Sequence, residues 1–497
     1  MLPFIYNFPF FSIILSMFSG TVSSVLNGKW ARRLNFAVLV VVGTLSAILL
    51  GYCVDTGESF TYMMGHFPAP WGNEIRAGML EAFLALFFCI IMLLSIVSGR
   101  VHLLEEIAEE KENQYYILLN LLLSSLLALI YTNDLFTAYV FVEINTIAAC
   151  GLIMIRGTGR TIEAAMRYII MSALGSGLLL LGLCILYDCT GHLLMSNIKE
   201  SIALVVANGE YQIPLLVAIG FICVGLAIKS ALFPFHSWLP DTYGYSTVTS
   251  AAILSSLVSK GYIFLLIKII YRVIGFDVIH DSKIINILFV FGLAGMIMGS
   301  LSAIKEKDIR RMIAYSSVAQ IGYIYMGIGL GTQEAMIASI FHILTHAATK
   351  SLLFVAQVGL TDASGRSKKF ADLTGAAYRN KIAGIAFTVG SLSMVGLPGL
   401  SGFVSKLLFA QSCIVDDYKM FPTLICLAIS TILNAIYFMK TVIHIYTPVK
   451  NDYEIIPFKK NIPYGIALIF FILLNFGLGL MSTPIVEIIK KGLSIFA

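Results

Sequence analysis

The sequence predicts an all-α, polytopic membrane protein with about 14 transmembrane helices. Of its 497 residues, 58% are apolar and only 12% are charged, and the mean hydropathy is +0.88. A soluble domain averages about 45–50% apolar and about 25% charged residues. At about 20 residues for each span and about 10–15 for each loop, the length accommodates about 14 spans. This composition excludes a soluble globular enzyme, a disordered chain and a disulfide-framed protein.

Apolar runs of spanning length follow one another along the whole chain, and no stretch between them is long enough for a soluble domain. The first run lacks a basic leader and a small-residue cleavage site, so we expect it to be a span rather than a signal peptide. The runs fall near residues 4–26, 34–52, 77–99, 115–132, 135–155, 164–187, 213–235, 246–271, 284–304, 311–330, 335–358, 382–410, 421–446 and 462–486.

The distribution of Lys and Arg predicts the orientation. Odd-numbered loops carry about 20 of these residues, Lys450, Lys459 and Lys460 among them, and the other side carries about 7. Because cytoplasmic loops are enriched in Lys and Arg, we expect the odd-numbered loops in the cytoplasm, both termini outside, and the chain in the cell membrane.

A few ionisable residues remain inside the predicted spans. A charge at the bilayer centre costs at least about 2.5–3.5 kcal/mol, so an intramembrane charge is treated as functional unless shown otherwise. The set comprises Glu143, Lys229, Lys260, Lys268, Lys350, Lys406 and Lys440, with His342 and His346, and Lys440 is also compatible with a position near an interface. Lys268 is near a helix end and is also compatible with snorkelling to the interface. Glu81 has no obvious neighbour in sequence and is left undecided.

Two of these lysines stand beside predicted helix breaks. Pro234 follows Lys229, and a proline inside a helix removes a hydrogen-bond donor and clashes with the preceding turn. Lys406 follows a run in which Pro398 stands between glycines. Broken helices are tolerated at membrane depth where they line a buried or wet cavity. Two such breaks, about 175 residues apart, indicate an internal repeat and a transport site.

Glu143 lies in an apolar run and therefore requires a cationic partner or a proton. We expect Lys229 to be a switchable proton carrier, with Glu143 as its modulator. The alternative is a fixed ion pair that only holds two helices together.

His342, His346 and Lys350 are spaced i, i+4, i+8 and share one helical face. Histidine titrates near neutral pH, which favours a proton relay. A metal site would need a third ligand, such as the glutamate of HExxH, which is absent here. Packed neutral histidines are the other alternative. Lys260, in the middle of a span, is a further candidate for the relay.

Several absences limit the chemistry of this chain. There is no Walker A motif, GxGxxG, haem motif or potassium-channel filter, and none of the eight cysteines forms a CxxC pair. We therefore expect no metal and no cofactor in this subunit, and no catalysis by this chain alone.

Three ordered motifs resemble a known family. Residues 229–243 (KSALFPFHSWLPDTY), 307–323 (KDIRRMIAYSSVAQIGY) and 396–406 (GLPGLSGFVSK) are similar to signatures of the antiporter-like subunits of respiratory complex I, Mrp sodium/proton antiporters and membrane-bound hydrogenases. The resemblance covers about residues 75–450. It implies a fourteen-helix core with two inverted five-helix repeats, in which helices 7 and 12 are discontinuous.

The resemblance also implies a domain division and site roles. The division is an N-terminal three-helix segment (1–110), a first repeat (111–275), a second repeat (276–447) and a C-terminal helix 14 (448–497). By position, Glu143 and Lys229 match the paired glutamate and lysine of helices 5 and 7. Lys260, His346 and Lys406 match the family positions on helices 8, 11 and 12.

The sequence departs from the family pattern at two places. The proline-containing run that usually opens helix 8 is GYSTVTS here, at residues 244–250. The chain ends soon after the last span, so no long lateral helix is expected. The expected absence of a lateral helix favours the Mrp D-type subunit or its counterpart in a hydrogenase. Lys406 favours the same class, because one complex I class has glutamate at this position.

These observations predict a proton-translocating subunit of a multisubunit membrane complex, with sodium exchange as a coupled possibility. Its expected partners are the other membrane subunits, protons, sodium and lipid, and no nucleic acid. The alternative is the pumping subunit of a redox-driven complex, a membrane-bound hydrogenase or NADH:quinone oxidoreductase. A structural scaffold with a silent channel is the third hypothesis.

Overall fold

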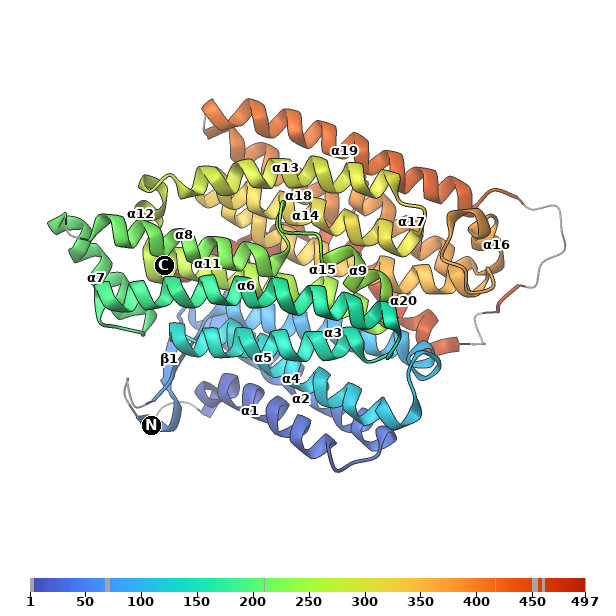
Figure 1. Ribbon diagram of the computed structural model, residues 1–497, viewed down its shortest axis with the longest axis horizontal. Helices are drawn as coiled ribbons and strands as arrows, with labels where there is room; N and C mark the ends of the chain where they lie inside the picture. The colour runs from blue at the N-terminus through green and yellow to red at the C-terminus, as the bar shows by residue number, and fades with distance from the viewer. Residues whose placement is uncertain are drawn as a thin grey trace.

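The structure is a computed structural model, and it describes residues 4–67, 72–209, 211–415, 417–448, 455–457 and 461–496. Long helices lie side by side and run from one end of the molecule to the other (Figure 1). Both termini lie at the same end, which an even number of crossings requires (Figure 1). Lys450, Lys459 and Lys460, which contributed to the predicted orientation, lie outside the described residues.

Twelve helical segments of the described chain are long and apolar enough to cross a membrane. The stretch Val248–Ile274 is one of them and contains α10 (Val248–Ile253), α11 (Ser259–Ile269) and two π-helical segments, Leu254–Val258 and Ile270–Ile274. The others are α1 (Phe8–Ser23), α2 (Gly28–Thr56), α3 (Met79–Glu106), α4 (Glu112–Tyr131), α5 (Leu135–Met154), α6 (Gly159–Thr190), α8 (Gln212–Ser230), α13 (Ile284–Lys305), α15 (Gln333–Asp362), α19 (Asp417–Ile445) and α20 (Ile462–Leu480).

Two further segments coincide with predicted spans without meeting this criterion. Helix α14 (Ile309–Leu330) has 22 residues and is almost wholly buried. The predicted run 382–410 is divided into α17 (Lys381–Val395) and α18 (Ser401–Ser412). The helical, multi-pass membrane fold is thus confirmed, whereas the count of 14 and the two five-helix repeats stay predictions.

Short elements fill the ends of the molecule. Strands β1 (Phe60–Met63) and β2 (Glu74–Ala77) form an antiparallel hairpin, with Phe60 opposite Ala77. The short helices are α7 (Met195–Asn208), α9 (Leu239–Tyr245), α12 (Phe276–Asp281), α16 (Ala376–Arg379) and α21 (Ser482–Phe496). These elements lie outside the predicted spans or at their edges, because they are too short or too polar to cross a bilayer.

Both predicted helix breaks are present. Helix α8 ends at Ser230, Ala231 has φ +63°, and Pro234 lies in the irregular stretch before α9. Helix α17 ends at Val395, and Gly396 and Gly399 have φ +95° and +88° before α18 begins. Glycine adopts these angles without the strain that a Cβ would cause. The segment after α9, which departs from the family pattern, contains a regular helix N-cap. The Thr247 hydroxyl caps α10 by accepting a hydrogen bond from the Ser250 amide at 3.1 Å.

Two spans that carry candidate lysines and histidines are buried along almost their whole length. Every residue of Ala335–Thr361 in α15 is buried, and so is every residue of Val248–Ile274. Peripheral helices instead present large apolar side chains outward, such as Ile170 on α6 and Leu473 on α20. Since buried polar groups find partners inside protein and not in lipid, this arrangement places the candidate residues in the interior.

Candidate functional site

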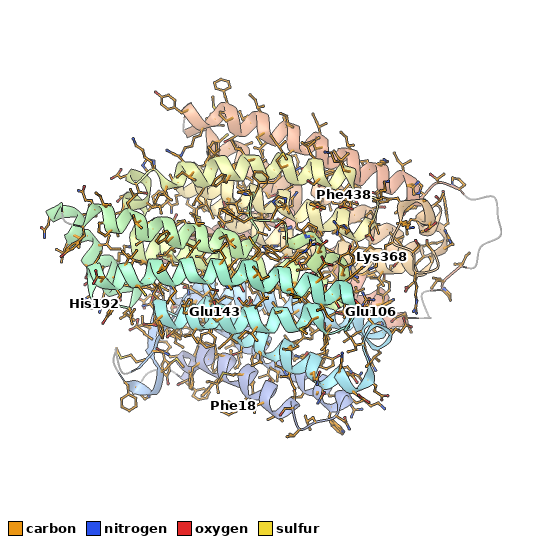
Figure 2. All side chains as sticks on the ribbon, viewed as in Figure 1. Phe18, Glu106, Glu143, His192, Lys368 and Phe438 are labelled. Atoms are coloured by element: carbon orange, nitrogen blue, oxygen red, sulfur yellow. The ribbon has the colours of Figure 1, made fainter. Side chains whose placement is uncertain are left out.

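Glu143 on α5 and Lys229 on α8 form an ion pair at the edge of the bundle. The lysine Nζ lies 3.5 Å from Glu143 Oε1, and the Ser176 hydroxyl on α6 donates a hydrogen bond to the same oxygen. The Lys229 side chain is fully buried, whereas that of Glu143 is 33% exposed. Glu143 lies on the face formed by α5 and α6 (Figure 2). The carboxylate therefore reaches the bundle surface while its partner lies inside.

A chain of neutral groups extends inward from Lys229. Its Nζ donates to the Thr146 hydroxyl at 2.8 Å, and Thr146 Oγ1 lies 3.3 Å from the Tyr262 hydroxyl. Tyr262 donates to Asn145 Oδ1 at 3.0 Å, and Asn145 donates to Ser125 at 2.8 Å. These contacts connect α8, α5, α11 and α4 through hydroxyl and amide groups that both donate and accept hydrogen bonds.

Close helix packing fixes the position of Lys229. A Cβ added at Gly175 on α6 would lie 2.8 Å from the Gly225 carbonyl oxygen and 3.1 Å from Lys229 Cγ. The small residue therefore lets α6 and α8 approach at the level of the lysine. Lys229 also stands in the last turn of α8, where the helix dipole favours a positive charge.

Lys260 is buried in the centre of the fold, directly after the π-helical segment Leu254–Val258. Its Nζ donates to the Ser255 carbonyl oxygen within this segment and to the Ser259 hydroxyl at 3.0 Å. Single π-helical turns are frequent at functional positions in helices. Among the described residues, no carboxylate lies within 4 Å of Lys260.

The two histidines of α15 stack on each other. Their ring centroids are 6.1 Å apart with an interplanar angle of 14°, and His342 Nδ1 lies 3.0 Å from the Ser405 hydroxyl on α18. In the described part of the chain, His342 Nε2 and both ring nitrogens of His346 have no hydrogen-bond partner. Buried polar atoms are normally satisfied by protein groups or by water, so these nitrogens are suitable partners for an ordered water.

Lys350 and Lys406 are held by backbone carbonyls. Lys350 Nζ donates to the Ile313 carbonyl at 2.8 Å and to the Ser316 hydroxyl, both on α14. Lys406 Nζ donates to the Val395 carbonyl at 2.8 Å and to the Thr431 hydroxyl at 3.0 Å. Neither lysine has a carboxylate within 4 Å in the described ranges.

Lys229, Lys260, His342, His346 and Lys350 are buried, whereas Glu143 and Lys406 are partly buried. His342 also stacks on Tyr323 of α14, with ring centroids 5.4 Å apart, and Lys406 Nζ lies 5.6 Å from the centroid of the same Tyr323 ring. Ser256, in the π-helical segment before Lys260, lies 2.6 Å (Oγ to Oγ) from Ser351, the neighbour of Lys350, and Lys229 Nζ lies 5.6 Å from the centroid of the Tyr262 ring on α11. The role of the predicted residues in transport remains a prediction.

Other buried charges have structural partners. Lys268 donates to the carbonyls of Leu129, Ile130 and Thr132, at 2.8, 2.6 and 2.8 Å, and so caps the C-terminal end of α4. Arg272, which the sequence did not single out, pairs with the undecided Glu81, and both are at most 3% exposed. The partners are 191 residues apart, so no local pattern indicated this pair.

Arg310 was also missed, because it was assigned to a loop. Its guanidinium is buried and donates to the carbonyls of Ser246 and Thr247, at 2.6 and 2.9 Å, in the link between α9 and α10. It therefore holds the start of α10 in place.

A polar cavity of about 220 Å³ lies at the end of α15, next to the loop before α16. At its rim His102 Nε2 lies 2.5 Å from Asp362 Oδ2. Lys368, also at the rim, donates to the Gly244 carbonyl at 3.3 Å. Burial and the neighbouring guanidinium of Arg310 lower the pKa of Lys368 to about 7. Glu106 and Lys368 mark this end of the molecule, opposite His192 (Figure 2).

The described residues contain no cluster of three or more His, Cys, Asp or Glu side chains that could hold a metal ion. The absence of a cofactor from this subunit remains an expectation.

The family profile described as NADH:quinone oxidoreductase/Mrp antiporter, transmembrane, matches residues 132–433, more than half of the chain. The chain belongs to this family. A relative from Desulforudis audaxviator, NADH-quinone oxidoreductase subunit N, is 31% identical over 443 residues, which are 88% of this chain and 86% of the relative. The D-type subunit of the Na(+)/H(+) antiporter of Alkalihalophilus pseudofirmus is 27% identical over 78% of this chain and 76% of its own.

Solved structures share the whole fold. A chain of the membrane-bound sulfane sulfur reductase, an archaeal respiratory membrane complex, has a TM-score of 0.87 and 25% identity, with 99% of this chain and 97% of that chain covered. A chain of the Mrp complex from Dietzia sp. DQ12-45-1b has a TM-score of 0.86 and 22% identity, with the same coverage of both chains. The resemblance inferred from the three motifs is confirmed: the family comprises proton-translocating, antiporter-like subunits of multisubunit membrane complexes.

Proposed function

We propose that this chain moves protons along the buried and partly buried residues described above, as one subunit of a larger membrane complex. The observation that carries the proposal is the Glu143–Lys229 pair beside a broken helix, followed by lysines without carboxylate partners among the described residues. The proton-carrying residues are Glu143, Lys229, Lys260, His342, His346, Lys350 and Lys406.

The pair at the bundle edge controls whether Lys229 holds a proton. The neutral amine accepts a proton, and the carboxylate of Glu143 stabilises the resulting ammonium. When Glu143 moves away, the buried ammonium loses this stabilisation and releases its proton. Because the Glu143 side chain reaches the surface, a neighbouring subunit is well placed to cause this movement.

The inner residues transfer the proton further. The hydroxyls of Thr146 and Tyr262 connect Lys229 to the centre of the fold. An imidazole accepts a proton on one nitrogen and releases another from the second, so the stacked His342 and His346 suit a relay between Lys260 and Lys406.

Two complexes are candidates for the whole assembly. The 31% identity to an NADH-quinone oxidoreductase subunit favours a redox-driven pump. Lys406, where one complex I class has glutamate, together with the Mrp relative, favours an Mrp-type antiporter in which proton movement is coupled to sodium. Proteoliposomes containing the purified complex distinguish them, because an electron donor energises the first and an imposed sodium gradient energises the second.

The proposal includes the membrane and the orientation of the chain. We place the chain in the cell membrane with the Lys/Arg-rich end in the cytoplasm and both termini outside. A C-terminal reporter that is active in the cytoplasm contradicts this orientation.

The decisive test replaces Lys229, the first lysine of the proposed path, by a residue of similar volume that cannot carry a proton. In Lys229→Met, proton uptake by proteoliposomes of the complex should fall by on the order of 10²-fold, as for other essential acid–base groups. The control is Lys29→Met, which removes an exposed lysine at the start of α2 and should transport normally. Transport at the wild-type rate by a folded Lys229→Met complex contradicts the proposed function.

A further inference from the structure

A separate cavity of about 700 Å³ opens between α13 and α19 at the Lys/Arg-rich end of the molecule. Its floor contains the loop between α13 and α14, and its walls come from α19, the start of α6 and residues 369–371. None of the proposed proton-carrying residues lines it.

The charges that line this cavity are unbalanced. Five Lys or Arg side chains face two carboxylates among the described residues, and those two are already engaged. Glu306 accepts from Arg311 Nε at 3.2 Å, and Asp308 caps α14 through the amides of Arg310 and Arg311 at 2.8 and 3.1 Å.

The remaining four cations are Arg160, Lys307, Lys369 and Lys440, and none of them has a carboxylate within 4 Å in the described part of the chain. All four side chains are exposed. Their charge is therefore available to an anion that enters the cavity.

The loops that carry these cations are tied together. The Phe370 amide donates to the Lys307 carbonyl at 3.1 Å, and the Ile309 amide donates to the Lys368 carbonyl at 3.0 Å. Lys307 and Lys369 are therefore held side by side, with no salt bridge to either among the described residues. Such preorganisation lowers the entropic cost of binding a ligand between them.

An apolar strip continues from the cavity toward the middle of the molecule. Ile304 on α13 and Ile436 on α19 line the cavity itself. One turn further along each helix, Leu301 is 37% and Ile432 is 61% exposed. Since residues three or four apart share a helical face, these side chains extend the same surface. A ligand seated here meets cations at one end and a hydrocarbon-like surface at the other.

We propose that this cavity binds the headgroup of an anionic glycerophospholipid, such as phosphatidylglycerol, with its acyl chains along the strip between α13 and α19. Basic pockets between transmembrane helices suit such headgroups. The Arg160 guanidinium offers paired donors to a phosphate, and the lysines act as point charges. The apolar strip favours a lipid over free phosphate or a soluble acidic peptide. This site is independent of the proposed proton path.

The test measures lipid retention by the purified complex. After detergent extraction, the complex is incubated with phosphatidylglycerol or phosphatidylcholine, and bound lipid is quantified by native mass spectrometry. We expect wild type to retain phosphatidylglycerol preferentially. Lys307→Gln/Lys369→Gln/Lys440→Gln should reduce this retention at least tenfold, because each cation near an anionic headgroup contributes a gain of about fivefold.

Two matched variants keep the result interpretable. Lys29→Gln/Lys199→Gln/Lys283→Gln makes the same change in net charge elsewhere and should retain the lipid. Lys307→Arg/Lys369→Arg/Lys440→Arg keeps the charge in place and should also retain it, so a loss confined to the Gln variant is not a folding defect.

Other outcomes overturn the proposal. Equal retention of phosphatidylglycerol by the Gln variant and by wild type contradicts a lipid site at these lysines. Displacement of the lipid by an equal concentration of inorganic phosphate or glycerophosphoglycerol shows an anion site without a lipid component. Cross-linking of Lys440→Cys to another subunit of the intact complex, with no lipid bound, shows a protein interface instead.

Discussion

The ammonium group of Lys406 donates a 2.8 Å hydrogen bond to the carbonyl oxygen of Val395, the last residue of α17. The helix break frees this carbonyl from the usual helical bond, and the lysine on α18 uses it. A buried amine with no carboxylate partner in the described ranges thus donates to the free carbonyl of a helix C-terminus. Lys229 occupies a related position in the last turn of α8, but it also forms an ion pair with Glu143.

We expect Lys406→Met to stop proton transport without unfolding the chain. The thioether keeps most of the side-chain volume but carries no proton, so transport should fall by on the order of 10²-fold. Proton uptake in proteoliposomes measures this loss, with Lys29→Met as the control. Normal uptake by the folded variant removes Lys406 from the path.

Gly396→Ala should disturb the same lysine indirectly. A Cβ at this position lies 3.1 Å from Lys406 Cδ, and the φ of +95° is unfavourable for alanine. We expect a loss of about 1–3 kcal/mol of stability from the backbone, together with reduced proton uptake. The matched control is Gly477→Ala on α20, where an added Cβ meets no atom within 4 Å and φ is not positive. If both variants transport equally, the fit around Lys406 does not matter for transport.

The buried Glu81–Arg272 pair should be structural. Replacing Arg272 by Met leaves an uncompensated carboxylate, which costs about 3–5 kcal/mol. The double variant Glu81→Gln/Arg272→Met should recover much of this loss, because no charge is then left unpaired. Thermal unfolding in detergent measures both. Equal melting temperatures for the single and double variants contradict this assignment.

Lys368 should make stability depend on pH. Its pKa is lowered to about 7, mainly by burial and by Arg310 and to a lesser extent by Arg156, while Asp308 and Glu106 act in the opposite direction. The unfolded chain binds this proton up to about pH 10.4, so it holds more protons than the folded chain above pH 7. Stability contributed by this group therefore rises between about pH 7 and pH 10.4, and at lower pH the burial penalty is fully present.

Lys368→Gln should flatten that part of the pH profile. Melting temperatures followed by tryptophan fluorescence from about pH 7 to about pH 9.5 should rise less in the variant than in wild type. The neighbouring Lys369→Gln removes an exposed lysine and should keep the wild-type slope. A slope that is unchanged by Lys368→Gln shows that Lys368 is not the responsible group.

The helix breaks and the intramembrane lysines were predictable because their signals are local. Pro234 and the glycines near residue 396 interrupt apolar runs within the sequence itself, and a lysine in such a run is conspicuous. The interpretation of Lys268 was less complete, since its three carbonyl partners lie at the end of a helix more than 130 residues earlier. Arg310 was assigned to a loop because its sequence neighbours are polar, although its guanidinium is buried.

The sequence alone was sufficient to predict the membrane fold and the approximate spans, because a bilayer requires about 20 apolar residues for each helix and tolerates few charges. Its three ordered motifs were sufficient to predict the family. Only the tertiary structure shows which of the buried charges have partners. Glu143 pairs with Lys229, Glu81 pairs with Arg272, and Lys406 depends on a carbonyl. The members of the two ion pairs stand on helices far apart in the chain, so helix packing alone brings them within hydrogen-bonding or ion-pairing distance.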